Sequence, residues 1–263
     1  MLGLNGMEYF RYEVLPNGKY KIIELWDTSV GELVVPGRVE AVGKNALCYS
    51  SAKKITLSEG VRVIGRTAFA GCRELVTVIL PSTLRELGDE AFLNCNSLSE
   101  IDIPEGITSL GYGTFSSCHS LGRVGLPNSL TQIGKMAFSS CESLSSVTIP
   151  DGVSEIGQYA FLKCTALTSV VIPHGIDSVS YSAFNFCTSL REVSLPDTVE
   201  FIGGAAFGSC KSLERVVLPR AVQYIGDYAF AGCTELKEIV MPKGVELGEC
   251  AFNLCDKLKI TEY

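Results

Sequence analysis

Apolar and polar residues repeat in a fixed order along most of this chain, with a period of 23 residues. Each unit contains a short stretch in which apolar and polar residues alternate, as at Val147, Thr148 and Ile149. Such alternation predicts a short β-strand with one buried face. Pro150 follows and is expected to end this strand, because proline has no N–H to donate to a sheet.

Three residue types mark the period most clearly. The prolines are Pro81, Pro104, Pro127, Pro150, Pro173, Pro196, Pro219 and Pro242. The phenylalanines are Phe69, Phe92, Phe115, Phe138, Phe161, Phe184, Phe207 and Phe230. The cysteines are Cys72, Cys95, Cys118, Cys141, Cys164, Cys187, Cys210 and Cys233. One unit has too few inward apolar positions to fold alone, so the pattern predicts stacked units around one continuous core.

The second half of each unit is predicted to bend sharply. Gly157 permits a tight bend, because glycine adopts backbone angles that other residues avoid. The segment with Ala160, Phe161 and Cys164 is too short for an ordinary helix. It predicts a single helical or 3-10 turn on the side away from the strand.

The period, the Ile-Pro strand ends and the Ile-Gly-x-x-Ala-Phe-x-x-Cys-x-x-Leu core resemble the BspA-like leucine-rich repeats of bacterial and protist surface proteins. The resemblance covers residues 36–263. It implies a leucine-rich-repeat solenoid, of the α/β class but β-dominated, in a right-handed curved stack of about ten coils. A parallel β-sheet is expected on the concave side, with the helical or 3-10 turns on the convex side.

The N-terminal region resembles the β-hairpin that commonly precedes such arrays. Residues 10–23 read as two strands, with Asn17 and Gly18 as a two-residue turn between them. We therefore expect an N-terminal hairpin cap over residues 1–35 and one continuous solenoid over residues 36–263. Residues 1–8 have neither a basic region nor a long apolar stretch, so we expect no signal peptide or anchor there.

Charge and hydropathy narrow the range of partners. The net charge is −7, and lysine and arginine are scattered along the chain. This distribution argues against nucleic acid or an anionic membrane surface as the main partner. No window approaches the roughly 18 apolar residues of a membrane helix, so we expect no membrane insertion. The resemblance implies a cell-surface or secreted protein, and a cytoplasmic location is the alternative.

The 11 cysteines invite a disulfide or metal interpretation. Disulfide frameworks have irregular spacing and zinc sites need close pairs, whereas these cysteines recur once per coil between Phe and Leu, without a Cys-x-x-Cys pair. We therefore predict that Cys72 to Cys233 form a buried, reduced thiol ladder with a structural role. Cys250 lies off this ladder and is the candidate for an exposed thiol.

No arrangement of residues predicts catalysis. His119 and His174 are the only histidines, and they occupy different places in the repeat, so they are interpreted as solvated loop residues. Glycines recur as bend residues rather than in a phosphate-binding loop. We expect no catalytic residue, no metal site and no cofactor.

Two sets of outward residues are candidates for ligand binding. If the strand valines point inward, the residues on either side of them point outward and form a continuous row on the concave face. The predicted binding residues are Glu100, Asp102, Arg123, Thr148, Glu192 and Arg215. The alternative is an ordinary solvated sheet face.

The second set is aromatic. Phe201 and Tyr224 share a repeat position that holds polar residues in earlier coils, and Tyr181 and Tyr228 lie nearby in sequence. Stacked outward aromatics would form an exposed patch that favours an interface. The alternative is that these rings merely cover the coil edge.

The sequence therefore predicts a non-enzymatic binding protein. The resemblance implies adhesion to a protein or glycoprotein ligand, which would lie along the curve, be steered by charges of both signs and be anchored by the aromatic patch. The alternative is a rigid structural spacer without a ligand, and an enzyme hidden in the loops comes third. A monomer is favoured.

Overall fold

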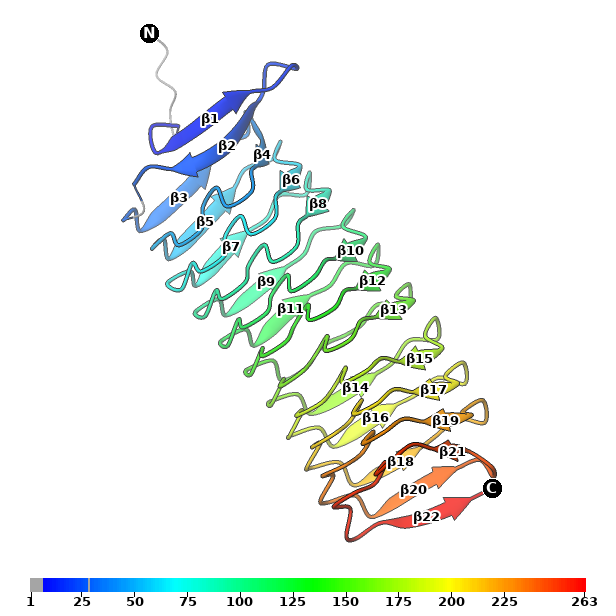
Figure 1. Ribbon diagram of the computed structural model, residues 1–263. Coiled ribbons are helices and arrows are strands. Elements are labelled where there is room, and N and C mark those ends of the chain that lie inside the picture. The colour runs from blue at the N-terminus through cyan, green and yellow to red at the C-terminus, as the bar shows by residue number, and fades with distance from the viewer. Residues whose placement is uncertain (1–6, 28) are drawn as a thin grey trace.

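The computed structural model describes residues 7–27 and 29–263. Most of the N-terminal segment considered above for a targeting signal, residues 1–6, lies outside the described residues. The chain winds into a stack of about 11 coils with β-strands on two sides (Figure 1). This architecture confirms the predicted solenoid.

One side of the stack carries the longer strands, and we call it the long-strand face. Most of its strands have three or four residues and lie parallel to their neighbours. They are β3 (Glu32–Val35), β5 (Lys54–Leu57), β7 (Thr77–Ile79), β9 (Glu100–Asp102), β11 (Arg123–Gly125), β14 (Ser169–Val171), β16 (Glu192–Ser194), β18 (Arg215–Val217), β20 (Glu238–Met241) and β22 (Lys259–Glu262).

The other strands, which each coil adds after its proline position, make up the short-strand face. From the third strand onward each has only two residues. They are β2 (Tyr20–Leu25), β4 (Val39–Val42), β6 (Val63–Ile64), β8 (Glu86–Leu87), β10 (Ser109–Leu110), β12 (Gln132–Ile133), β13 (Glu155–Ile156), β15 (Ser178–Val179), β17 (Phe201–Ile202), β19 (Tyr224–Ile225) and β21 (Glu246–Leu247). Most coils thus add one strand to each of the two faces, and the two faces enclose the core.

A hairpin caps the N-terminal end of the stack, as predicted. β1 (Phe10–Val14) pairs antiparallel with β2, and β2 pairs in parallel with β4. β3 likewise pairs in parallel with β5. The boundary between cap and solenoid at residue 35 stays a prediction.

The loop of this hairpin differs from the expected two-residue turn. The N–H of Leu15 donates to the carbonyl of Lys19 at 2.8 Å, so residues 16–18 form a three-residue loop. The N–H of Gly18 donates to the carbonyl of Leu15, and Gly18 has a φ of 78°. Pro16 accounts for the difference, because its fixed φ favours the first central position of a type I turn followed by a left-handed residue.

One coil lacks the strand that its alternating pattern predicts. Residues 147–149 are not in a strand, and the sheet stops at β11 and resumes at β14 (Figure 1). Val147 is only partly buried, whereas its counterparts Val124 and Val170 are buried. No strand pairing joins residues 147–149 to β11 or β14, so the strand predicted here is wrong.

The predicted helical turn around Phe161 is also wrong. Successive N–H groups in this segment alternate in their acceptors: one donates to a carbonyl of the next coil, and the following one donates to a carbonyl of its own bend. This is not the pattern of a helix. Phe161 donates to the carbonyl of Ala183 in the next coil at 2.8 Å, while Cys164 donates back to the carbonyl of Phe161 at 3.2 Å.

In the described part of the chain no helix is long and apolar enough to cross a membrane.

Two residues per bend have left-handed backbone angles, four positions apart. The first position holds Asn45, Thr67, Glu90, Gly113, Met136, Tyr159, Ser182, Ala205, Tyr228 and Cys250. The second position holds Tyr49, Gly71, Asn94, Ser117, Ser140, Lys163, Phe186, Ser209, Gly232 and Leu254. This conformation costs an L-residue about 1–2 kcal/mol. Hydrogen bonds to the next coil offset this cost, because the left-handed conformation directs backbone N–H groups toward that coil. The N–H of Lys163, for example, donates to the carbonyl of Asn185 at 2.8 Å.

The core is built as columns of like residues. The phenylalanine rings from Phe69 to Phe252 stack in order, with centroids 4.9–5.7 Å apart and planes within 14° of each other. The first eight of these rings are fully buried. Leucine, isoleucine, valine and cysteine columns surround them in one continuous core.

Phe161→Ala should lower the free energy of unfolding by about 3–5 kcal/mol, because it opens a cavity between two stacked rings that the neighbouring coils cannot close. Phe201→Ala is the matched control. It removes the same atoms from a ring that is 42% exposed and should cost less than about 1 kcal/mol. Urea denaturation of both variants measures the difference. Equal losses would mean that the phenylalanine column is not the core.

Lys163→Gly should be more stable than Lys163→Ala by about 0.5–1 kcal/mol, because the φ of 59° at this exposed position penalises any Cβ. The same pair at Lys211, which is exposed and does not have a positive φ, provides the control. There the order should reverse, since glycine only adds entropy to the unfolded chain. Thermal or urea unfolding of the four variants checks both signs, and the same order at both positions would contradict the strain argument.

Candidate functional site

Outward residues on the long-strand face lie in register from coil to coil. Glu100 pairs with Arg123 and Asp102 with Gly125 across β9 and β11. The Arg123 guanidinium lies 2.8 Å from Asp102 and 3.6 Å from Glu100, and all three side chains are more than half exposed. The hydrogen bond with Asp102 raises the pKa of Arg123. This cation is therefore already paired with two carboxylates of the preceding coil.

Charges alternate in the same way near the C-terminal end of this face. The Nε of Arg215 donates to Glu238 at 2.8 Å, and this bond holds the pKa of Glu238 below its ordinary value. Glu192 lies one coil earlier and is exposed. Opposite charges from adjacent coils thus face solvent side by side, and exposed pairs of this kind contribute little to stability.

The long-strand face is hollowed over β14, β16 and β18. Two adjoining hollows of about 740 and 690 Å³ share Val193, Ser194 and Val217. The sheet is divided at this place, since β16 bonds to β14 and β18 bonds to β20. Val193 is only partly buried there, unlike its counterparts Val170 and Val216. The division between β16 and β18 therefore exposes part of the core.

These hollows combine an apolar floor with a charged rim. The floor is formed by Val193, Leu195, Val217 and Leu218, and the rim carries Arg191, Glu192, Asp197, Glu214, Arg215 and Arg220. Tyr263 closes one end, and its hydroxyl donates to the carbonyl of Leu218 at 2.8 Å. An apolar centre within a polar rim is the arrangement found at protein interfaces.

The structure distributes the six predicted row residues unevenly. Glu192 and Arg215 line the C-terminal hollows, and Glu100 and Asp102 line a smaller hollow of about 210 Å³ over β7 and β9. Arg123 pairs with that acidic cluster, and Thr148 lies exposed where the sheet is interrupted. Val193 and Leu195 of the floor occupy core positions of the repeat, so the sequence pattern alone did not indicate their exposure.

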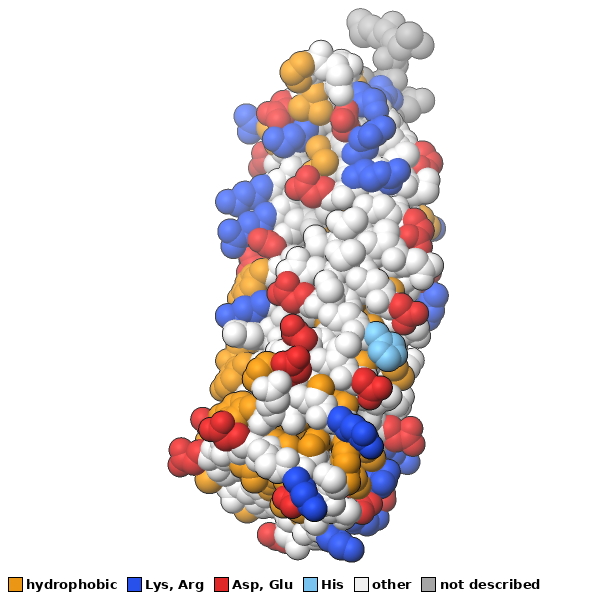
Figure 2. Space-filling view, turned by 90° about the vertical axis from the view of Figure 1, so that its right-hand side faces the viewer, with side chains coloured by type: hydrophobic (Ala, Val, Ile, Leu, Met, Phe, Trp, Pro, Cys, Tyr) orange, Lys and Arg blue, Asp and Glu red, His pale blue; other side chains and the backbone are white. Residues whose placement is uncertain are grey.

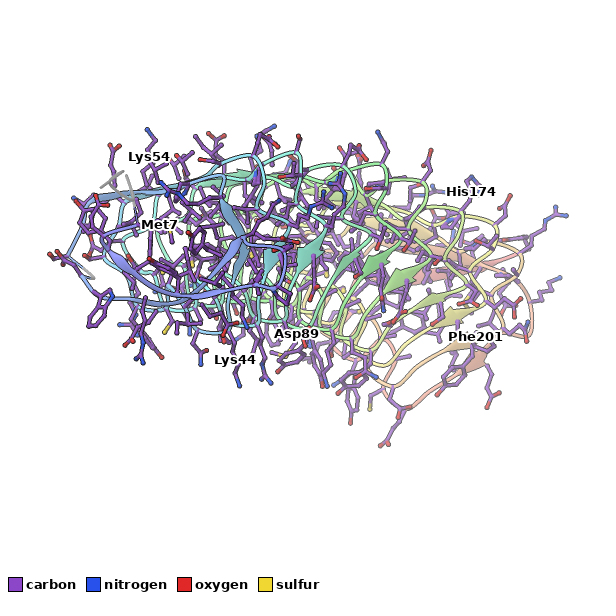
Figure 3. All side chains as sticks on the ribbon, turned by 90° about the horizontal axis from the view of Figure 1, so that it is seen from above. Met7, Lys44, Lys54, Asp89, His174 and Phe201 are labelled. Atoms are coloured by element: carbon purple, nitrogen blue, oxygen red, sulfur yellow. The ribbon has the colours of Figure 1, made fainter. Side chains whose placement is uncertain are left out.

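The predicted aromatic patch lies on a different face from the charged row. Phe201 and Tyr224 belong to β17 and β19 of the short-strand face, where they lie side by side. Figure 3 shows Phe201 and Lys54, the latter from β5 of the long-strand face, on opposite sides of the molecule. One ligand lying along the long-strand face therefore does not reach the aromatic residues, which corrects the grouping made from sequence.

The periodic cysteines contact the backbone of neighbouring coils. All cysteines are free thiols, and the eight from Cys72 to Cys233 are fully buried. From Cys95 to Cys233, each Sγ donates to the carbonyl of a phenylalanine in the preceding coil at 3.1–3.3 Å; Cys187, for example, donates to Phe161. Burial raises the pKa of Cys187 to about 12. These thiols thus make bonds between coils in addition to filling the core.

The two histidines are not part of the hollows or of the aromatic patch. His119 is partly exposed, and its Nδ1 lies 3.1 Å from the carbonyl oxygen of Ser140 in the next coil, a contact that the sequence did not predict. His174 is exposed in the loop after β14. Within residues 7–27 and 29–263, no group of three or more His, Cys, Asp or Glu residues is placed to hold a metal ion.

Comparison with known proteins identifies relatives. The family described as "BspA type Leucine rich repeat region (6 copies)" matches residues 40–168 and 154–263. No curated protein matches the chain. The crystal structure of the T. pallidum leucine-rich repeat protein is 29% identical, with a TM-score of 0.56, over 78% of this chain and 88% of that one.

Two further solved structures share the fold. A leucine-rich cell surface protein from Faecalibacterium prausnitzii is 23% identical, with a TM-score of 0.53, over 97% of this chain and 93% of that one. A leucine-rich repeat protein from Eubacterium ventriosum is 19% identical, with a TM-score of 0.53, over 98% of this chain and 95% of that one. At these identities the likeness shows the fold alone.

Iodoacetamide at pH 8 should modify Cys250 in the native protein and leave Cys72 to Cys233 unmodified, because burial raises their pKa values and removes the reactive thiolate. In denaturant all 11 cysteines should react. Mass spectrometry of the labelled peptides gives the count. Disulfide-linked peptides, or rapid native labelling between Cys72 and Cys233, would overturn the thiol ladder.

Proposed function

The chain belongs to the BspA-type leucine-rich repeat family, and on that basis we propose that it is a non-enzymatic module that binds a protein or glycoprotein ligand on its long-strand face. Repeat solenoids present extended surfaces that serve binding, because every coil adds one more row of side chains. Family membership supports a scaffold role rather than catalysis. Adhesion at a cell surface is the specific form of this function that we propose.

The hollow at the division between β16 and β18 is the observation that carries the proposal. It exposes Val193 and Leu195 beneath an open surface, where a projecting apolar side chain of a ligand fits. Binding energy in protein interfaces concentrates in such partly desolvated pockets. The adjoining Val171 is 66% exposed and extends the apolar surface toward β14.

The charged row is proposed to form the polar margin of the same interface. Glu192 and Arg215 lie on the rim of the main hollow, and Glu100, Asp102, Arg123 and Thr148 lie farther along the face. Because Arg123 and Arg215 are paired with carboxylates of neighbouring coils, the row presents alternating charges rather than one strong field. Such a margin contributes mainly to the choice of partner and the association rate.

A cell-surface or secreted location is part of the proposal. The relative from Faecalibacterium prausnitzii is described as a cell surface protein, which supports this location for a chain with the same fold. A rigid spacer that holds another domain would have the same fold. It differs in predicting a long-strand face without any ligand.

Ser194→Trp should abolish or weaken ligand binding at least tenfold, because Ser194 lines both adjoining hollows and a large side chain there fills them. The assay is surface plasmon resonance against immobilised collagen, laminin, fibronectin and mucin. Ser109→Trp, at an exposed position on β10 of the short-strand face, is the matched control and should bind as the unmodified protein does. Equal binding by both variants would place the interface elsewhere, and no binding to any of the four ligands would favour the spacer.

A further inference from the structure

The C-terminal half of the short-strand face presents a strip of aromatic rings. Its members are Tyr159, Tyr181, Phe201, Tyr224 and Tyr228, from four successive coils. Phe201 is 42%, Tyr181 47% and Tyr228 45% exposed. Tyr159 and Tyr181 meet edge to face at 5.3 Å, and Phe201 and Tyr224 are partners across β17 and β19. All five side chains are at least partly exposed, so the rings lie outside the core.

A glycine in the following coil makes room for one of these rings. A Cβ on Gly204 would lie 3.1 Å from the Cδ2 and 3.2 Å from the Cε2 of Tyr181, so one edge of the ring approaches the backbone of the next coil. Tyr181 is nevertheless 47% exposed. A broad, accessible ring face is the part of an aromatic residue that carries negative electrostatic potential.

In the C-terminal half, the charged residues in the rows that carry these rings are all acidic, although Lys163 lies farther along the bend. The outward positions of the short-strand face and its bend carry Glu155, Asp177, Glu200, Asp227, Glu246 and Glu249 between residues 154 and 251. None of the equivalent positions in this half holds lysine or arginine, whereas the N-terminal half carries Lys44, Arg62, Arg66, Arg85 and Lys135. Figure 2 shows the change along its left-hand margin, where lysine and arginine above give way to hydrophobic and acidic side chains below.

Electrostatic repulsion from Cys250 and then from the carboxylate of Glu249 raises the pKa of Tyr228. Glu200 accepts a hydrogen bond from Gln223, and Asp227 accepts one from the N–H of Glu249, so the donors to these two carboxylates are neutral. No salt bridge neutralises any of the six carboxylates among the described residues.

The first ring of the strip already accepts an ammonium group. Lys135 reaches across from the preceding coil and places its Nζ 5.8 Å from the ring centroid of Tyr159. This is the geometry of a cation–π interaction. Among the described residues, none of the other rings of the strip has a lysine or arginine over it.

We propose that this strip docks a lysine- and arginine-rich segment of a partner protein. Its cationic side chains lie over the exposed rings and pair with the carboxylates beside them, as Lys135 does at Tyr159. The strip spans several coils at about 4.8 Å each, which is long enough for an extended segment of about five or six residues. Acidic proteins and anionic lipid surfaces are repelled by the same charges.

This site is separate from the ligand face proposed above. Phe201 and Lys54 point to opposite sides of the molecule (Figure 3), so a partner on the short-strand face leaves the hollow at β16 and β18 open. Failure of one proposal therefore does not affect the other. Variants on each face distinguish the two sites.

Fluorescence anisotropy with a labelled eight-residue peptide of alternating arginine and serine tests the proposal. The unmodified protein should bind this peptide and should not bind a glutamate–serine peptide of the same length. Phe201→Ala combined with Tyr224→Ala should weaken binding at least fivefold, although the net charge of −7 is unchanged. This variant separates docking on the rings from general attraction to an acidic protein, and circular dichroism confirms that it is folded.

Two further measurements decide the outcome. Val171→Ala combined with Val217→Ala removes exposed apolar groups from the long-strand face and should leave peptide binding unchanged. Equal binding of the two peptides, or full binding by the Phe201/Tyr224 variant, would overturn the proposal. Sedimentation velocity provides the last check: a dimer that dissociates in the Phe201/Tyr224 variant would make a second copy of the chain the occupant and would also overturn it.

Discussion

Hydrogen bonds between successive coils hold each residue beside its counterpart from the preceding unit, and the rest of the structure depends on this register. On the strand faces the bonds place Phe201 next to Tyr224, and in the bends the N–H of Phe161 reaches the carbonyl of Ala183. Their spacing sets the rise per coil near the usual 4.8 Å between strands. Every core position must therefore pack against a copy of itself. Flat rings satisfy this condition, and the phenylalanine column keeps centroid distances of 4.9–5.7 Å.

The same register gives the buried thiols a structural role that a simple hydrophobic residue could not fill. The carbonyl of Phe161 accepts the N–H of Cys164 within its own bend and the Sγ of Cys187 from the next coil. A cysteine is small and apolar enough for a closed column, yet it still has a weak donor. The bends are thus joined by backbone and thiol bonds together, which offsets the left-handed conformations at positions such as Tyr159 and Lys163.

The sequence predicted the columns because a column is a property of the period. Phe161 and Cys164 could be assigned to the core, and Glu192 and Phe201 to the outside, from spacing alone. The bend conformation could not be predicted in the same way, because it depends on carbonyls in the next coil. Only the glycines and asparagines at these positions, such as Gly71 and Asn94, gave a signal of left-handed angles. The hollow at Val193 was missed for a related reason. It arises where two sheets separate, and no single unit of the pattern contains that separation.

Stacking in register also makes unpaired like charges costly, and this distinguishes the two faces. Outward residues in one row lie about one strand spacing apart, so like charges in adjacent coils repel. The long-strand face avoids the repulsion by alternating signs, as at Arg123 beside Glu100 and Asp102. The short-strand face does not: Asp177 is followed in its row by Glu200, and Asp227 by Glu249, without a lysine or arginine between them.

Nothing in the fold requires this acidic half, because its positions lie outside the core and the corresponding positions of earlier coils hold residues such as Arg62 and Lys135. Repulsion between exposed carboxylates is modest but unfavourable, and it adds to the cost of exposing Phe201 and Tyr181 beside them. A cationic partner removes both costs at once, since it neutralises the carboxylates and covers the rings. The features that are least favourable for the isolated solenoid are thus those that a basic segment would relieve.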